Sequence, residues 1–214
     1  MRPAPKLVVV VADKAYQLVL TELLARAREA GFAPPATTIV PDPFHDSSGR
    51  MADLLRPYLR DHDHALVLRD FAGSGYESQT APRLERDLEE QICRNGWQGR
   101  KYAAIVAQPE IEDWLRLPSP AVLKLLRRYA RRRKAELEDF ESVLQSLITK
   151  HGGRDDRGKA HHPKEVFDDL VTYYGIPRSA GLRGYLAKHE PLSACASESF
   201  NRLLATLRFW FPRQ

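Results

Sequence analysis

Cysteine and long apolar runs are scarce in this chain of 214 residues. The two cysteines, Cys93 and Cys195, lie far apart and outside any zinc-ligand spacing, which excludes a zinc finger or a disulfide scaffold and fits a reducing cytoplasm. The longest apolar run, Leu7 to Ala12, has six residues, far below the ~18 of a membrane-spanning helix. We also find no signal-peptide pattern, so we expect a cytoplasmic protein with no membrane partner.

A strong charge imbalance is missing as well. Lys and Arg number 33 against 28 Asp and Glu, and the resulting net charge of +5 is modest for this length. Such a charge permits nucleic-acid binding without requiring it. Hydrophobic residues make up 43% of the chain, which excludes intrinsic disorder and suffices for a core without disulfides or a structural metal.

Short apolar segments alternate with helical patterns in the first half of the chain. We predict strands over residues 7–11, 37–40, 65–68 and 102–107, and helices over residues 18–27, 51–58 and 82–94. This alternation predicts a three-layer, Rossmann-like α/β fold with a mostly parallel sheet.

The second half has a helical pattern throughout. We predict helices over residues 120–148, 164–174 and 198–211. The sequence thus predicts an α/β domain over residues 1–117 and a helical C-terminal region over residues 118–214 that packs on it.

Acidic residues follow three of the predicted strands. Asp13 follows the first, Asp70 the third, and Glu112 and Asp113 come shortly after the fourth. The carboxyl ends of parallel strands meet at one edge of the sheet, where such folds carry their chemistry. Converging carboxylates repel one another unless a divalent cation neutralises them, and Mg²⁺ accepts sparse oxygen sites of this kind. The alternative for each acid is a helix cap or an ordinary loop residue.

These segments resemble a TOPRIM-like family of bacterial proteins, the RloB type and related distant relatives of OLD-family nucleases, which accompany phage-defence systems. The resemblance is carried by Asp70-Phe-Ala-Gly73 and by Gln108-Pro-Glu-Ile-Glu-Asp-Trp114, which places Glu112 and Trp114 in the family's Pro-x-x-Glu-x-Trp pattern. Tyr185-Leu-Ala-Lys188 is similar to its closing Tyr-x-Lys segment. The resemblance implies a Mg²⁺-dependent nuclease, with Mn²⁺ as a substitute ion.

In that interpretation Asp70 and Glu112 are catalytic, and they hold the metal with Asp13 and Asp113. TOPRIM enzymes, however, place a Glu after the first strand and an Asp-x-Asp after a later one. Here Ala12 or Asp13 stands at the first position, and Ala72 replaces the second Asp. The chain is therefore either an active nuclease or a catalytically degenerate subunit. A degenerate subunit of a defence system, such as a methylation-associated one, binds nucleic acid or docks an ATPase or nuclease partner.

A segregated basic segment is the second notable pattern. Seven cations and no acid occur between Pro118 and Ala135, namely Lys124, Arg127, Arg128, Arg131, Arg132, Arg133 and Lys134. The first four share one face of a helix. We predict that Lys124, Arg127, Arg128, Arg131 and Arg132 contact a nucleic-acid backbone. The alternative is a solvated face balanced by the acids that follow it.

Overall fold

The computed structural model describes residues 4–44, 50–114, 117, 119–133, 140–156, 158–195 and 197–213, and within its helices it leaves out the side chains of residues 130–133, 180 and 194. The chain folds around one parallel sheet. Its strands are β1 (Lys6–Val11), β2 (Ala36–Pro41), β3 (His64–Asp70) and β4 (Lys101–Ala107). Their order in the sheet is β2-β1-β3-β4, and all three pairings are parallel.

Residues 7–11 of strand β1 are fully buried because the sheet is covered on both faces. Val9 pairs with Ile39 of β2 and with Leu66 of β3, and it shows no exposed surface. A wholly apolar strand of this kind is typical of parallel sheets that carry helices on both sides. The predicted three-layer α/β fold is therefore confirmed.

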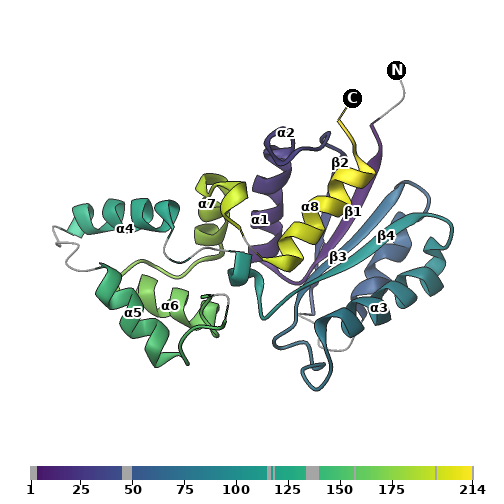
Figure 1. Cartoon of the computed structure of the whole chain (residues 1–214). Helices are drawn as coiled ribbons and strands as arrows, with labels where there is room; N and C mark the ends of the chain where they lie inside the picture. Colours follow the sequence, from purple (N-terminus) through teal and green to yellow (C-terminus); the bar gives the residue numbers. More distant parts are fainter. Residues whose placement is uncertain are drawn as a thin grey trace.

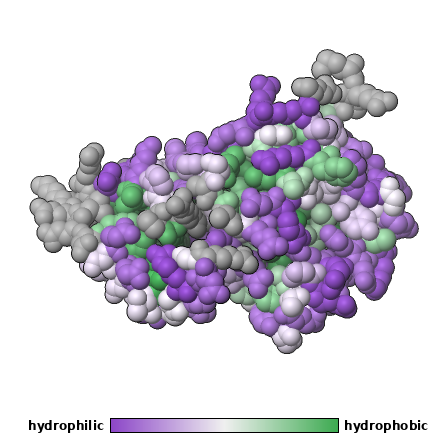
Figure 2. Space-filling model, in the orientation of Figure 1, coloured by the Kyte–Doolittle hydropathy of each residue, from purple (hydrophilic) through white to green (hydrophobic). Residues whose placement is uncertain are grey.

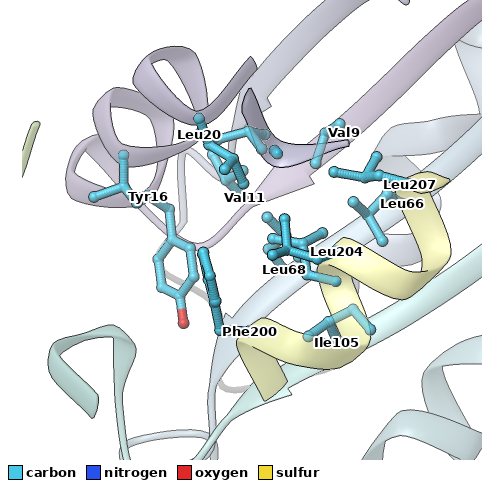
Figure 3. Packing of buried hydrophobic residues seen from close by; sticks show 14 of the residues in the cluster. Val9, Val11, Tyr16, Leu20, Leu66, Leu68, Ile105, Phe200, Leu204 and Leu207 are labelled. Carbon is cyan, nitrogen blue, oxygen red and sulfur yellow. The ribbon is translucent and has the colours of Figure 1, made fainter. Parts of the chain in front are cut away.

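Helices α1 (Lys14–Ala25) and α8 (Glu198–Trp210) cover one face of the sheet (Figure 1). Alternate strand residues, such as Leu66 and Leu68, meet Leu204 and Leu207 of α8 in one apolar cluster (Figure 3). The 3₁₀ helix η1 (Arg50–Tyr58) and helix α3 (Ala81–Ile92) cover the other face. Helix α8 is therefore part of the α/β layers, although the sequence assigned it to the helical C-terminal region.

The remaining helices form a third cluster beside the sheet (Figure 1). They are α4 (Pro120–Arg133), α5 (Phe140–Lys150), α6 (Pro163–Tyr173) and α7 (Ala180–His189). The single helix predicted over residues 120–148 is wrong, because the described residues form α4 and α5, which run in different directions (Figure 1) and pack into the same cluster. Residues 134–139, which include the predicted cation Lys134, lie outside the described residues.

Helix α7 was not predicted, and it links the helical cluster to the sheet layers. Its Gly184 packs on Leu18 of α1, and a Cβ added at Gly184 would lie 3.1 Å from the Leu18 Cβ. The described part of the chain also contains short helical segments: α2 (Ala27–Ala30), η2 (Cys93–Trp97), η3 (Ile111–Trp114) and η4 (Leu192–Ala194).

Hydrophilic residues cover most of the face seen in Figure 2. Within the described ranges, none of the helices combines the length and apolar character that crossing a membrane demands.

Candidate functional site

Asp70 ends strand β3 and is held by two donors. The Tyr16 hydroxyl donates to Asp70 Oδ1 at 2.6 Å, and the Ile111 backbone N–H donates to the same oxygen at 2.7 Å. Burial raises the pKa of Asp70 to about 7, and the nearby charge of Glu112 adds to this effect, whereas the two donors oppose it. Asp70 therefore changes its protonation state near neutral pH.

Asp13 caps the first helix, which is the alternative to a metal ligand that the sequence offered for a strand-end acid. Its Oδ1 accepts the Tyr16 backbone N–H at 3.0 Å at the start of α1. Such a bond satisfies one of the free donors in the first turn of a helix. Tyr16 thus touches both predicted acids, through its backbone to Asp13 and through its hydroxyl to Asp70. Burial, followed by the charge of Asp70, raises the pKa of the Tyr16 hydroxyl, which keeps it a donor.

A small crevice of about 150 Å³ lies at the carboxyl ends of the central strands. Its lining residues are Ala12, Asp13, Asp42, Met51, Arg69, Asp70, Ala72 and Gly73. The chain leaves β1 toward β2 and leaves β3 toward β4, which are opposite directions along the sheet, so β1 and β3 flank the switch point at which doubly wound folds bind ligands. The fold therefore places Asp13 and Asp70 where ligand chemistry is expected.

Sequence reasoning missed Asp42 and Arg69 in this crevice. Asp42 follows β2, is 3% exposed, and accepts the Phe44 backbone N–H at 2.9 Å. Its position between Pro41 and Pro43 indicates only the end of a strand. Arg69 precedes Asp70 and is 4% exposed, and it donates to the Ser74 carbonyl at 3.4 Å. A charged residue inside an otherwise apolar strand was the available signal for Arg69.

The acids after β4 are paired with cations from α6, α7 and the segment between α5 and α6. Arg183 of α7 donates from Nε to Glu112 Oε1 at 2.5 Å, and Glu112 is only 3% exposed. Lys159 lies 2.7 Å from Asp113 Oδ1. Lys164 of α6 lies 2.8 Å from the preceding acid, Glu110.

These pairs set the electrostatics of the acidic edge, which we define as Asp13, Asp70, Glu110, Glu112 and Asp113. The carboxylates converge, since the charge of Glu112 helps to raise the pKa of Asp70. The bond from Lys164 to Glu110 raises the pKa of that lysine. Burial, the largest single effect, lowers the pKa of Arg183, but the charge of Glu112, the hydrogen bond to Glu112 and the charges of Asp168 and Asp13 together raise it. Protein side chains therefore supply the positive charge that the sequence pattern led us to expect from a metal ion.

The donor set of the acidic edge does not fit the predicted Mg²⁺ site. The Arg183 guanidinium occupies Glu112 Oε1, the Lys159 ammonium occupies Asp113 Oδ1, and one oxygen of Asp70 already accepts two hydrogen bonds. Across the described part of the chain, no three His, Cys, Asp or Glu side chains are grouped so that they could share a metal ion. The magnesium assignment stays a prediction from the sequence.

Trp114 lies beneath the acidic edge as part of the core. It is 5% exposed, and its Nε1 donates to Ser199 Oγ of α8 at 2.8 Å. Its ring meets Tyr16 edge-on, with the ring centroids 5.9 Å apart. Trp114 therefore supports the residue that contacts Asp70.

The predicted basic face borders a groove between α4 and α7. Lys124, Arg127 and Arg128 are exposed, and they line a cavity of about 580 Å³ with Pro120, Leu123 and Tyr185. Arg131 and Arg132 belong to the same helix, but their side chains lie outside the described part. We call this cavity the α4–α7 groove.

Positive charge from both helices acts on the same region. His189 of α7 is exposed, and its ring lies 4.4 Å from that of Tyr185, centroid to centroid. Desolvation lowers the pKa of His189, and the positive charges of Lys124 and Lys188 lower it further. No local pattern indicated Tyr185 as part of this surface, because it lies far from Lys124 along the chain.

No family model, curated protein or solved structure matches this chain. The TOPRIM-like resemblance thus rests on its short motifs.

Proposed function

We propose that the protein is a nucleic-acid-binding, catalytically degenerate TOPRIM-like component of a bacterial antiphage defence system. The observation that carries the binding activity is the α4–α7 groove, where Lys124, Arg127 and Arg128 line one cavity that no carboxylate lines among the described residues. Cations gathered on one helix face neutralise backbone phosphates and release counterions, which drives binding without regard to sequence. The defence role rests on the family resemblance alone.

The acidic edge supports the degenerate interpretation. Ala72 stands where the family's second aspartate belongs, and the carboxylates of Glu112 and Asp113 are engaged by Arg183 and Lys159. Ion pairs of this kind hold the helical cluster against the sheet. In this proposal the acids after β4 position the α4–α7 groove and do not act on a phosphodiester bond.

Binding is tested by fluorescence anisotropy with labelled DNA and RNA oligonucleotides at several salt concentrations. The groove variant combines Lys124→Glu, Arg127→Glu and Arg128→Glu, and we expect it to abolish salt-sensitive binding. The control variant combines Arg83→Glu, Arg86→Glu and Arg94→Glu, three exposed residues of α3 or the segment just after it, and makes the same change in net charge. A wild-type protein that binds neither nucleic acid, or a control variant that loses as much affinity as the groove variant, would contradict the proposal.

The Mg²⁺-dependent nuclease stays the rival prediction. It requires that Arg183 and Lys159 release their carboxylates. Incubation of plasmid DNA and of RNA with the protein and Mg²⁺ or Mn²⁺ tests it, with Asp70→Ala and Glu112→Ala as controls. Cleavage by the wild type that both variants lose would support the nuclease and overturn the degenerate interpretation.

The resemblance also implies a protein partner, an ATPase or a nuclease of the same defence system. Co-purification with the products of neighbouring genes tests this prediction. The groove variant serves as its control, because a protein contact elsewhere on the surface persists when the three groove cations are reversed.

A further inference from the structure

The α4–α7 groove differs from a plain basic surface in having an aromatic and apolar wall. Lys124, Arg127 and Arg128 supply charge from α4, whereas Pro120, Leu123 and Tyr185 supply apolar and aromatic surface. Its volume of about 580 Å³ falls within the ~300–1,000 Å³ range of small-molecule sites. The groove is therefore large enough to take in a single unpaired base beside its phosphate.

Tyr185 packs against the helical cluster and is also accessible from the groove. It is half-buried and packs against the helical cluster, while it also lines the cavity. The ring of His189, one turn later on α7, lies next to it and is exposed. An aromatic ring fixed on one side by core packing offers a platform for another flat ring at little cost in conformational entropy.

We propose that the α4–α7 groove binds single-stranded nucleic acid, with an unpaired base stacked on Tyr185 and the adjoining phosphates bound by Lys124, Arg127 and Arg128. The inference rests on the proposed nucleic-acid-binding function and narrows its substrate class. Single-strand-binding proteins combine a positive groove with aromatic platforms. In a duplex both faces of each base are covered by neighbouring bases, so an aromatic wall adds affinity for unpaired strands only.

The spacing of the cations on α4 agrees with binding to the backbone of one continuous nucleic-acid strand. Lys124, Arg127 and Arg128 stand at i, i+3 and i+4 on one helix face. The rise from Lys124 to Arg128 is about 6 Å along the helix axis, at ~1.5 Å per residue. Consecutive phosphates of a strand that follows α4 therefore meet successive cations, while their bases turn toward the wall formed by α7.

The experiment measures anisotropy of labelled single-stranded DNA, single-stranded RNA and duplex DNA of matched sequence at one salt concentration. We expect at least one single strand to bind about tenfold more tightly than the duplex, and Tyr185→Leu to reduce that affinity by about tenfold. Tyr185→Leu reduces duplex affinity much less than single-strand affinity, and Tyr185→Trp retains single-strand affinity. Tyr173→Leu is the matched control, because Tyr173 is 66% exposed on α6 and outside the groove. Melting curves of all variants identify any loss of fold.

The outcomes separate the inference from the function on which it rests. Equal affinity for single strand and duplex, with no effect of Tyr185→Leu in a folded protein, overturns the single-strand inference and leaves nucleic-acid binding in place. No binding to any of the three probes overturns both. If Tyr185→Leu does not fold, Tyr185→Trp provides the test. Loss of the preference for single strands in Tyr185→Trp contradicts the inference. A retained preference, with quenching of tryptophan fluorescence on binding, supports it. The DNA and RNA arms show which strand chemistry the groove prefers.

Discussion

Arg183 of α7 donates from its guanidinium to the buried carboxylate of Glu112, a residue that lies 71 positions earlier in the chain. This pair joins the helical cluster to the acidic edge of the sheet. Two residues after Arg183, Tyr185 lines the α4–α7 groove. One helix therefore carries both the counter-charge for the acidic edge and the aromatic wall of the proposed binding site.

Arg183→Ala is expected to destabilise the protein by about 3–5 kcal/mol, because it leaves the Glu112 charge buried without a partner. Arg56→Ala is the control, since the Arg56–Asp53 pair is exposed on both sides and such pairs contribute about 0–1 kcal/mol. Urea denaturation measures both. The double change Arg183→Met with Glu112→Gln should recover much of the loss, because no buried charge remains. Equal effects of Arg183→Ala and Arg56→Ala would show that the buried pair contributes no more than a surface pair.

Asp70 should make stability depend on pH between about pH 4 and pH 7. Its pKa is raised to about 7 in the folded protein, against ~3.9 in an unfolded chain. The folded state therefore binds the proton more tightly, so this stabilisation is complete below pH ~4 and is lost as the pH rises to 7. The slope is about 1.4 kcal/mol per pH unit within the window.

The comparison with Asp70→Asn isolates this contribution. Urea denaturation at several pH values should show a stability difference between wild type and variant that changes steadily from pH 4 to 7. The pKa values of Glu85 and Glu110 are also raised, chiefly by burial, but both residues titrate in the variant as well and cancel in the difference. Parallel curves for the two proteins would mean that Asp70 is ionised throughout.

Nucleic-acid affinity should fall with salt according to the number of phosphates that the groove neutralises. For a single strand the logarithm of the binding constant changes by ~0.7 per contact for each decade of salt. Arg128→Gln should therefore reduce the slope by about 0.7, and the combined neutral changes Lys124→Gln, Arg127→Gln and Arg128→Gln should reduce it by about 2. Titrations at four salt concentrations measure the slope, with Arg86→Gln on α3 as the control. An unchanged slope in Arg128→Gln would place its side chain away from the phosphates.

Gly184→Val should destabilise the contact between α7 and α1. Even a Cβ at this position would lie 3.1 Å from the Leu18 Cβ, and overpacking of this kind costs about 1–3 kcal/mol. Gly181→Val is the matched control on the same helix, since a Cβ there meets only the Ser179 hydroxyl, at 3.6 Å. Thermal unfolding compares the two. Similar melting temperatures would show that the α1–α7 packing adjusts freely.

The fold and half of the candidate site could be predicted from sequence. Apolar runs such as Leu7–Val11 determine buried strands, and strands that alternate with helices lead to a parallel sheet whose carboxyl ends meet. The approach of Asp13 to Asp70 follows from that topology. The charge state of the site could not be predicted, because the counter-charges Arg183 and Lys159 follow Glu112 and Asp113 by 71 and 46 positions.

Local patterns were also insufficient in the helical cluster. The spacing of apolar residues in α4 continues into α5, so periodicity alone could not indicate that the two are separate helices. Helix α7 contains Gly181 and Gly184 within ten residues, which weakens its helical signal. Gly184 nevertheless suits its place, because a Cβ there would crowd the Leu18 Cβ at 3.1 Å.

The position of α8 has a consequence for how the chain folds during synthesis. Strand β1 lies in the middle of the sheet, yet the helix that covers Leu66 and Leu68 is made from residues 198–210. All four strands leave the ribosome before the entire helical cluster and long before α8, which covers Leu66 and Leu68. In that interval one side of the nascent sheet presents apolar side chains that favour misassociation. Burial of Leu66 and Leu68 in this cluster is therefore complete only when α8 has been made, and not when the four strands have paired.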